Sequence, residues 1–144
     1  MRTLTLMLAI LLAAASPGHA QDAPHHLLIH VDSPDTKVMV EALRNAANTI
    51  DTIHKQGGTV AIEIVANGLG TSMFIDALSP VKPEIKSFHA AYPEVVLSAC
   101  GISLAHTEES MKTRLTVMPE ARVVPSGAVL IMELEEQHWA YLKP

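Results

Sequence analysis

The stretch that decides the fold is "LLIHVDSPDTKVMVEALRNAANTIDTIHKQGGTVAIEIVA", residues 27–66. It opens with the short apolar run 27–31 and closes with the run 60–66, which is rich in β-branched side chains, and both are typical of strands. Between the two runs, six apolar residues share one face at helical spacing: Met39, Leu43, Ala46, Ala47, Ile50 and Ile53. Such a β-α-β unit has a right-handed crossover, so the sequence predicts two parallel strands in one sheet.

The ends of this predicted helix carry recognisable stop and start residues. Ser33 followed by Pro34 predicts an N-cap and a first-turn proline, and Asp35 suits the positive end of the helix. Gly57 and Gly58 predict its end, because glycine accepts the left-handed conformation that closes many helices.

The rest of the chain repeats the pattern with weaker signals. Residues 83–91 can hold a short helix, and residues 95–99, 122–124 and 139–142 are predicted as the third, fourth and fifth strands. The apolar run 128–134 suits a strand as well as a helix, but an N-cap at Ser126 and the need for a crossover before the fifth strand favour a helix. The predicted fold is a three-layer α/β/α domain with a five-stranded, mostly parallel sheet.

The beginning of the chain looks like an export sequence. Arg2, the apolar stretch 4–15 and small residues up to Ala20 predict a signal peptide over residues 1–20, cleaved after Ala20. Residues 21–26 are predicted to be a flexible stub, and residues 27–144 a single domain. We therefore expect an exported, periplasmic protein without a membrane anchor, and its net charge of −5 argues against nucleic acid or anionic lipid as partners.

Cys100 is the single cysteine, at the end of the apolar part of "VVLSACGIS", residues 95–103. It follows a predicted strand, so it lies at the sheet edge where reactive groups collect in parallel sheets. A helix that starts after Ser103 would favour the thiolate, and His106 is a candidate to lower the thiol pKa further. The alternative is an inert, buried thiol that packs as a small hydrophobic group, and the residues alone leave both open.

Other polar or glycine residues share this predicted edge. His30 and Asp32 end the first strand, where a lone histidine is more often a hydrogen-bonded structural group than a base. "ANGLG", residues 66–70, offers backbone N–H groups for an anion nest but lacks the spacing of a phosphate loop, so a tight turn is favoured. The predicted pocket around the cysteine contains His30, Asp32, Asn67, Gly68, Gly70, Gly101 and Ser126.

The common hydrolase and nucleotide-binding motifs do not occur in the sequence. There is no dinucleotide fingerprint, Walker A loop, HExxH segment or Ser-His-Asp signature. The adjacent His25 and His26 have no third ligand beside them in the sequence, so we expect neither a metal site nor a cofactor.

Three segments in order resemble the DsrE/DsrF-like family, in particular its small exported members with one cysteine. They are residues 99–101 (Ala-Cys-Gly), 124–127 (Val-Pro-Ser-Gly) and 139–144 (Trp-Ala-Tyr-Leu-Lys-Pro). The resemblance covers essentially residues 21–144. It implies a five-stranded parallel sheet between helices, trimers or hexamers of the chain, and a cysteine that carries sulfur as a persulfide in intracellular relatives.

Three functions follow as hypotheses. The first is a sulfur carrier or sulfurtransferase that holds a persulfide on Cys100 and exchanges sulfur with a donor or acceptor protein or a small sulfur compound. The second is a non-catalytic oligomeric binding or scaffold module with a buried structural cysteine. The third is a pocket that binds an anion or metabolite on the backbone of Gly68 and Gly70 without covalent chemistry.

Overall fold

The protein forms a five-stranded parallel sheet, described over residues 25–144 in a computed structural model. The strands are β1 (His25–Val31), β2 (Val60–Ala66), β3 (Val96–Cys100), β4 (Arg122–Val124) and β5 (Ala140–Leu142). Their order across the sheet is β4-β3-β2-β1-β5, and each neighbouring pair is parallel. The expected signal peptide, residues 1–20, lies outside the described residues.

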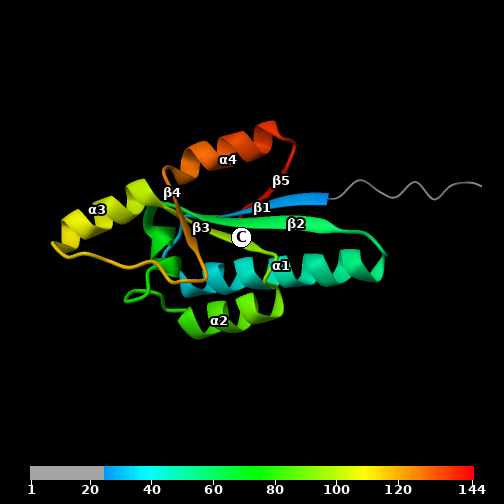
Figure 1. Cartoon of the computed structure of the whole chain (residues 1–144), viewed down its shortest axis with the longest axis horizontal. Coiled ribbons are helices and arrows are strands. Elements are labelled where there is room, and N and C mark those ends of the chain that lie inside the picture. Colours follow the sequence, from blue (N-terminus) through cyan, green and yellow to red (C-terminus); the bar gives the residue numbers. More distant parts are fainter. Residues whose placement is uncertain (1–24) are drawn as a thin grey trace, which may run out of the picture.

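Helices cover both faces of the sheet, which confirms the three-layer α/β/α architecture (Figure 1). They are α1 (Thr36–Lys55), α2 (Lys82–Ala91), α3 (Gly101–Met111) and α4 (Gly127–Glu136), with a 3-10 helix η1 (Gly68–Phe74) after β2. The chain steps in one direction from β1 to β4, so right-handed crossovers place α1 and α2 on the same face. The return from β4 to β5 runs back across the sheet and places α4 on the opposite face (Figure 1).

Strand alternation divides the apolar side chains between two core clusters. The larger cluster lies on the α1 side of the sheet and contains Ile62, Ile64 and Ala66 of β2. The smaller cluster lies under α4 and contains Leu28, Val65, Ile131 and Leu134. Most of the buried apolar residues therefore lie on the α1 side of the sheet. The α4 side has fewer of them, and it also contains buried polar side chains.

One polar network occupies the α4 side within the strands. Glu63 is 4% exposed, and its carboxylate accepts hydrogen bonds from the Ser98 hydroxyl and from the Arg122 guanidinium, the latter at 2.8 Å. Arg122 also donates to the Ser98 hydroxyl at 2.9 Å. The charge of this buried carboxylate is thus matched by an arginine from the edge strand β4.

Two local predictions were wrong. The N-cap of α1 is Asp35 and not Ser33, because the Asp35 carboxylate accepts the Lys37 N–H at 2.8 Å, and Pro34 lies before the helix rather than in its first turn. Residues 25 and 26 of the expected flexible stub belong to β1, since His25 pairs with Val60 and the His26 ring lies 5.1 Å from the Trp139 ring.

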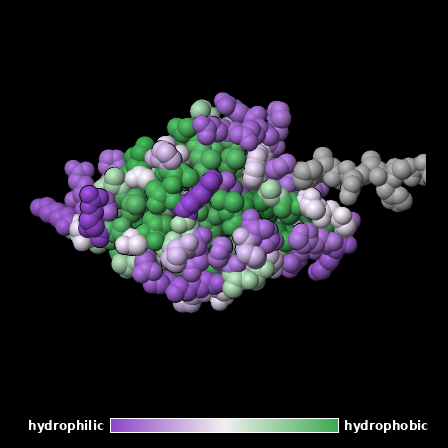
Figure 2. All heavy atoms as spheres, in the orientation of Figure 1, coloured by the Kyte–Doolittle hydropathy of each residue, from purple (hydrophilic) through white to green (hydrophobic). Residues whose placement is uncertain are grey.

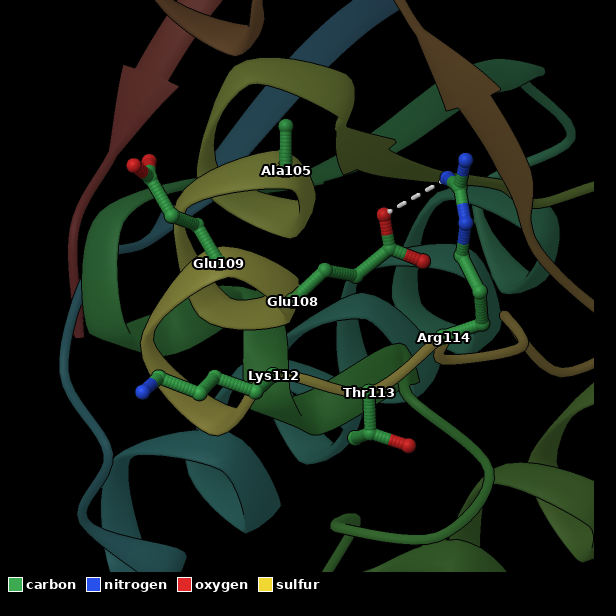
Figure 3. A pocket seen from close by; sticks show the side chains of 6 residues that line it. All are labelled: Ala105, Glu108, Glu109, Lys112, Thr113 and Arg114. Carbon is green, nitrogen blue, oxygen red and sulfur yellow. Dashed lines mark hydrogen bonds and ion pairs between the residues drawn. The ribbon is translucent and has the colours of Figure 1, made fainter.

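Helix α3 differs from the others because none of its residues is buried. It extends outward from the end of β3 (Figure 1). Figure 3 shows how its last turn is held: Glu108 reaches toward Arg114, whose guanidinium lies 3.1 Å from the carboxylate, while Glu109 and Lys112 point away. Glu108 also accepts the Leu115 N–H at 2.9 Å, which caps the turn where Lys112 takes a left-handed conformation.

Several large apolar side chains remain exposed among the described residues. Figure 2 shows hydrophobic surface in the middle of the face, between α3 and α4, framed by hydrophilic residues. The exposed large apolar residues include Leu69, Ile102, Met111, Val123, Val129 and Met132. Within residues 25–144, no helix combines the length and the apolar character that crossing a membrane requires.

Candidate functional site

The candidate site lies at the carboxyl ends of four adjacent strands, on the side of the sheet that α4 covers. Ala66 of β2 pairs with Ala99 of β3, so Asn67 and Cys100, the next residues along, lie side by side. His30 of β1 and Tyr141 of β5 continue the row. His30 pairs with Val65, two residues before Asn67, and Tyr141 pairs with Leu28, two residues before His30. The row runs Tyr141, His30, Asn67, Cys100 across the edge of the sheet.

Cys100 ends β3 and is the N-cap residue of α3, so the helix begins directly at Gly101, earlier than the expected start after Ser103. It is 4% exposed. Burial raises the pKa of its thiol, but hydrogen bonds from the Ser103 hydroxyl and from the backbone N–H groups of Gly127, Ser103 and Ile102 lower it by more, so the pKa lies below its usual value. The groups that lower the pKa of the thiol therefore belong to the first turns of two helices, α3 and α4.

Gly127 brings the start of α4 against the cysteine. A Cβ at this position would lie 3.0 Å from Cβ of Asn67 and 3.1 Å from Cβ of Cys100. A side chain there would push the first turn of α4 away from the sulfur, so glycine is what allows the N–H group to reach it. Ser126 precedes it as the N-cap of α4, confirmed by the hydrogen bond from the Val129 N–H to its hydroxyl at 3.4 Å.

Ser103 links the cysteine to the β2 loop. Its hydroxyl accepts the Gly68 N–H at 2.8 Å and is also a hydrogen-bonding partner of Cys100. On the outer side, a shallow groove of about 380 Å³ runs between α3 and η1. It is lined by Gly68, Leu69, Ser103, His106, Thr107 and Ser110.

His30 is a hydrogen-bonded group at this edge, as its position predicts. Its Nε2 lies 2.8 Å from Oδ1 of Asn67, and its Nδ1 lies 2.6 Å from the Tyr141 hydroxyl. Asp32, two residues further, forms an ion pair with Lys143 at 2.5 Å. The Lys143 ammonium lowers the pKa of the Asp32 carboxyl, against a smaller opposing effect of burial.

The glycines of the "ANGLG" turn have separate roles. Gly68 has a φ of +52°. Its N–H donates a hydrogen bond to the Ser103 hydroxyl, so it is not available to an anion as the nest hypothesis requires. Gly70 is buried, and a Cβ there would lie 2.3 Å from the Val31 carbonyl oxygen. Gly101 is similarly constrained, since its Cβ would lie 3.0 Å from the Val124 carbonyl oxygen. Close packing of backbone on backbone explains Gly70 and Gly101.

The role predicted for His106 is not what the structure shows. His106 is exposed on α3 and lines the outer groove, and it is not among the groups that shift the pKa of Cys100. Six residues along a helix correspond to about 9 Å of rise, which carries it away from the first turn. Ser103 and Gly127 interact with the sulfur instead, and only Ser103 has a local sequence signal, as a hydroxyl residue in the first turn after Cys100.

No family model and no curated protein matches this sequence. Among solved structures, the chain resembles a protein of unknown function, MTH1491 from Methanobacterium thermoautotrophicum, with a TM-score of 0.69 and 21% sequence identity. The match covers 83% of this chain and 99% of the other. At this identity the likeness shows a shared fold.

Proposed function

We propose that this chain is an exported, DsrE/F-like sulfur carrier in which the Cys100 thiolate accepts a sulfane sulfur and holds it as a persulfide. The observation that carries the proposal is the set of donors around one sulfur atom. The Ser103 hydroxyl and three backbone N–H groups from two helices lower the pKa of Cys100 despite its burial. A thiolate is the form of cysteine that attacks sulfur.

The proposed step balances without an external oxidant. The Cys100 thiolate attacks the terminal sulfur of a donor persulfide, a new S–S bond forms at Cys100, and the S–S bond of the donor breaks. The electron pair of that bond leaves with the donor sulfur, which takes up a proton as a thiol. Transfer to an acceptor thiolate is the same step in reverse, with Cys100 as the leaving group.

Loading with glutathione persulfide tests the proposal. The protein is incubated with the donor, the donor is removed, and the intact mass is measured. We expect an added mass of about 32 Da, one sulfur, located on the peptide that contains Cys100. The Cys100→Ser variant should gain nothing, and an unmodified wild-type protein whose thiol also resists alkylation while folded would refute the carrier function.

A second candidate function is supported by the 4% exposure of Cys100 and by the apolar surface between α3 and α4. In this alternative the chain is an oligomeric scaffold and the cysteine is structural. Replacing Cys100 by serine separates the two functions, because a polar group in a structural apolar site destabilises the fold or its assembly. Sedimentation and thermal unfolding of the variant should be normal for a carrier and impaired for a scaffold.

A further inference from the structure

Two helices supply the groups around the Cys100 sulfur, and they are anchored to the rest of the protein in different ways. The first turns of α3 and α4 both contribute groups that lower the pKa of the thiol. Helix α4 buries Ile131 and Leu134 against Leu28 and Val65 of the sheet, whereas no residue of α3 is buried. Because burial of apolar side chains is the main force that holds a helix on a sheet, α3 is the more weakly held of the two.

The side of α3 that faces η1 offers little apolar contact. A shallow groove of about 380 Å³ separates the two, and its α3 side includes Ser103, Thr107 and Ser110. The large apolar residues Ile102 and Met111 are 53% and 49% exposed. Helix α3 has 11 residues, and an isolated helix shorter than about 12–15 residues is marginal in water. It can therefore unfold at a lower cost than the helices that pack on the core.

The end of α3 is tied to its own segment rather than to the core. Glu108 pairs with Arg114 and accepts the Leu115 N–H, so both contacts lie within residues 101–115 (Figure 3). No residue of this segment is buried. The chain rejoins the core just after it, where Met118 is fully buried and donates its N–H to a carbonyl oxygen of η1 at 2.9 Å. The weakly packed segment thus has a firm boundary on each side, at β3 and at Met118.

We infer that residues 101–115 form a lid over Cys100, which opens by local unfolding while the sheet and helices α1, α2 and α4 stay folded. Opening breaks the hydrogen bond from the Gly68 N–H to the Ser103 hydroxyl, 2.8 Å long, and separates α3 from the sulfur. Local openings cost less free energy than global unfolding, and they occur where few apolar groups are buried. A cysteine that is 4% exposed with the lid closed is reached in this way without loss of the core. The lid goes beyond the proposed function, because it applies equally to a sulfur carrier and to a structural thiol.

Native-state hydrogen exchange and alkylation of Cys100 with iodoacetamide test the lid together. Both are measured at a series of denaturant concentrations below the unfolding transition. We expect the amides of residues 105–111 to be protected at least about 100-fold less than those of residues 42–50 in α1. Alkylation should show the same weak dependence on denaturant as the α3 amides, since this dependence scales with the surface that an opening exposes.

Two results of this experiment would refute the lid. One is exchange in α3 that is as slow as exchange in α1. The other is a thiol that becomes reactive only with the steep denaturant dependence of global unfolding.

Substitutions at exposed positions of α3 should move the alkylation rate in opposite directions. Ala105→Gly lowers the helix propensity and should speed alkylation about fivefold, whereas Ser110→Ala raises the propensity and should slow alkylation about twofold. Arg44→Gly is the control, because it makes the same kind of change at an exposed position of α1 and should leave the rate in the absence of denaturant unchanged. Equal acceleration by Ala105→Gly and Arg44→Gly would show that the thiol is reached by global unfolding. Unchanged rates in both α3 variants would show that α3 is not the barrier, and either result would overturn the inference.

Discussion

Helices α1 and α3 both follow a strand of the same sheet, but they contribute to the molecule in different ways. Five residues of α1 are buried against the sheet, including Met39, Leu43 and Ile50, whereas no residue of α3 is buried. What α3 provides is its first turn, which directs N–H groups and the Ser103 hydroxyl at Cys100. Helix α1 therefore contributes buried core residues, whereas α3 contributes groups beside the candidate reactive thiol.

The largest expected effect tests this division in the core. Ile50 of α1 is 2% exposed and Ile102 of α3 is 53% exposed, so the two isoleucines make a matched pair. Ile50→Ala should lower the free energy of unfolding by about 2–5 kcal/mol, the usual cost of truncating a buried isoleucine. Ile102→Ala should change it by no more than about 0.5 kcal/mol, as surface substitutions do.

Denaturant unfolding measures both changes. Sedimentation of the two variants is needed beside it, because Ile102 belongs to the exposed apolar surface near α3. A loss of stability in Ile102→Ala that is close to the loss in Ile50→Ala would show that α3 is buried in an assembly, and it would end the contrast between the helices.

The same contrast explains which features the sequence could predict. The helical spacing of six apolar residues predicted α1, and apolar runs predicted β1, β2 and β3 to within two residues, while β4 was predicted over the residues that form it, 122–124. Helix α1 and strands β1 to β3 follow from local patterns of burial. The partners of Cys100 do not follow from such patterns. Gly127 is brought to Cys100 by the packing of α4 across the sheet, and no sequence feature distinguishes this glycine, the first residue of α4, for that role.

The second prediction concerns that contact. Gly127→Ala places a Cβ against the Cβ atoms of Asn67, which follows β2, and of Cys100, which ends β3, so the first turn of α4 has to shift. We expect a loss of about 1–3 kcal/mol in the free energy of unfolding, typical of overpacking. The pKa of Cys100 should rise, because a donor to the thiolate is withdrawn, and alkylation at neutral pH should slow.

Val129→Ala is the matched control, since Val129 lies on the same helix and is 47% exposed. It should leave the alkylation rate of Cys100 unchanged. A Gly127→Ala protein whose thiol titrates as in the wild type would show that α3 alone sets the pKa of Cys100.

The third prediction isolates the first turn of α3. Ser103→Ala removes the hydroxyl that bonds to Cys100, so the pKa of the thiol should rise and the pH profile of alkylation should move to higher pH. Thr107→Ala is the control, because its hydroxyl bonds within α3 to the Ser103 carbonyl oxygen at 2.9 Å. An unchanged profile in Ser103→Ala would contradict the role given to this hydroxyl.

The same lowered pKa predicts how stability depends on pH. A thiol whose pKa is lower in the folded than in the unfolded protein stabilises the fold once the pH exceeds the unfolded pKa. The contribution is lost as the pH falls through the lowered, folded value. Wild-type protein should therefore gain stability relative to Cys100→Ala as the pH rises through this range, and parallel pH curves for the two proteins would show that the thiolate is not favoured by folding.

The smallest expected effect belongs to an ion pair at the same edge of the sheet. Asp32 and Lys143 lie 2.5 Å apart, but their side chains are 39% and 46% exposed, so water screens their attraction. Lys143→Gln should return the pKa of Asp32 upward toward its usual value, followed by NMR titration, with no resolvable change in melting temperature. The alkylation profile of Cys100 should also stay the same, because its pKa is set by donors from α3 and α4 and not by this pair. A shifted profile would mean that charges along the whole edge of the sheet act on the sulfur. The pKa of Cys100 would then not be set mainly by the first turn of α3, and this difference between α3 and α1 would no longer hold.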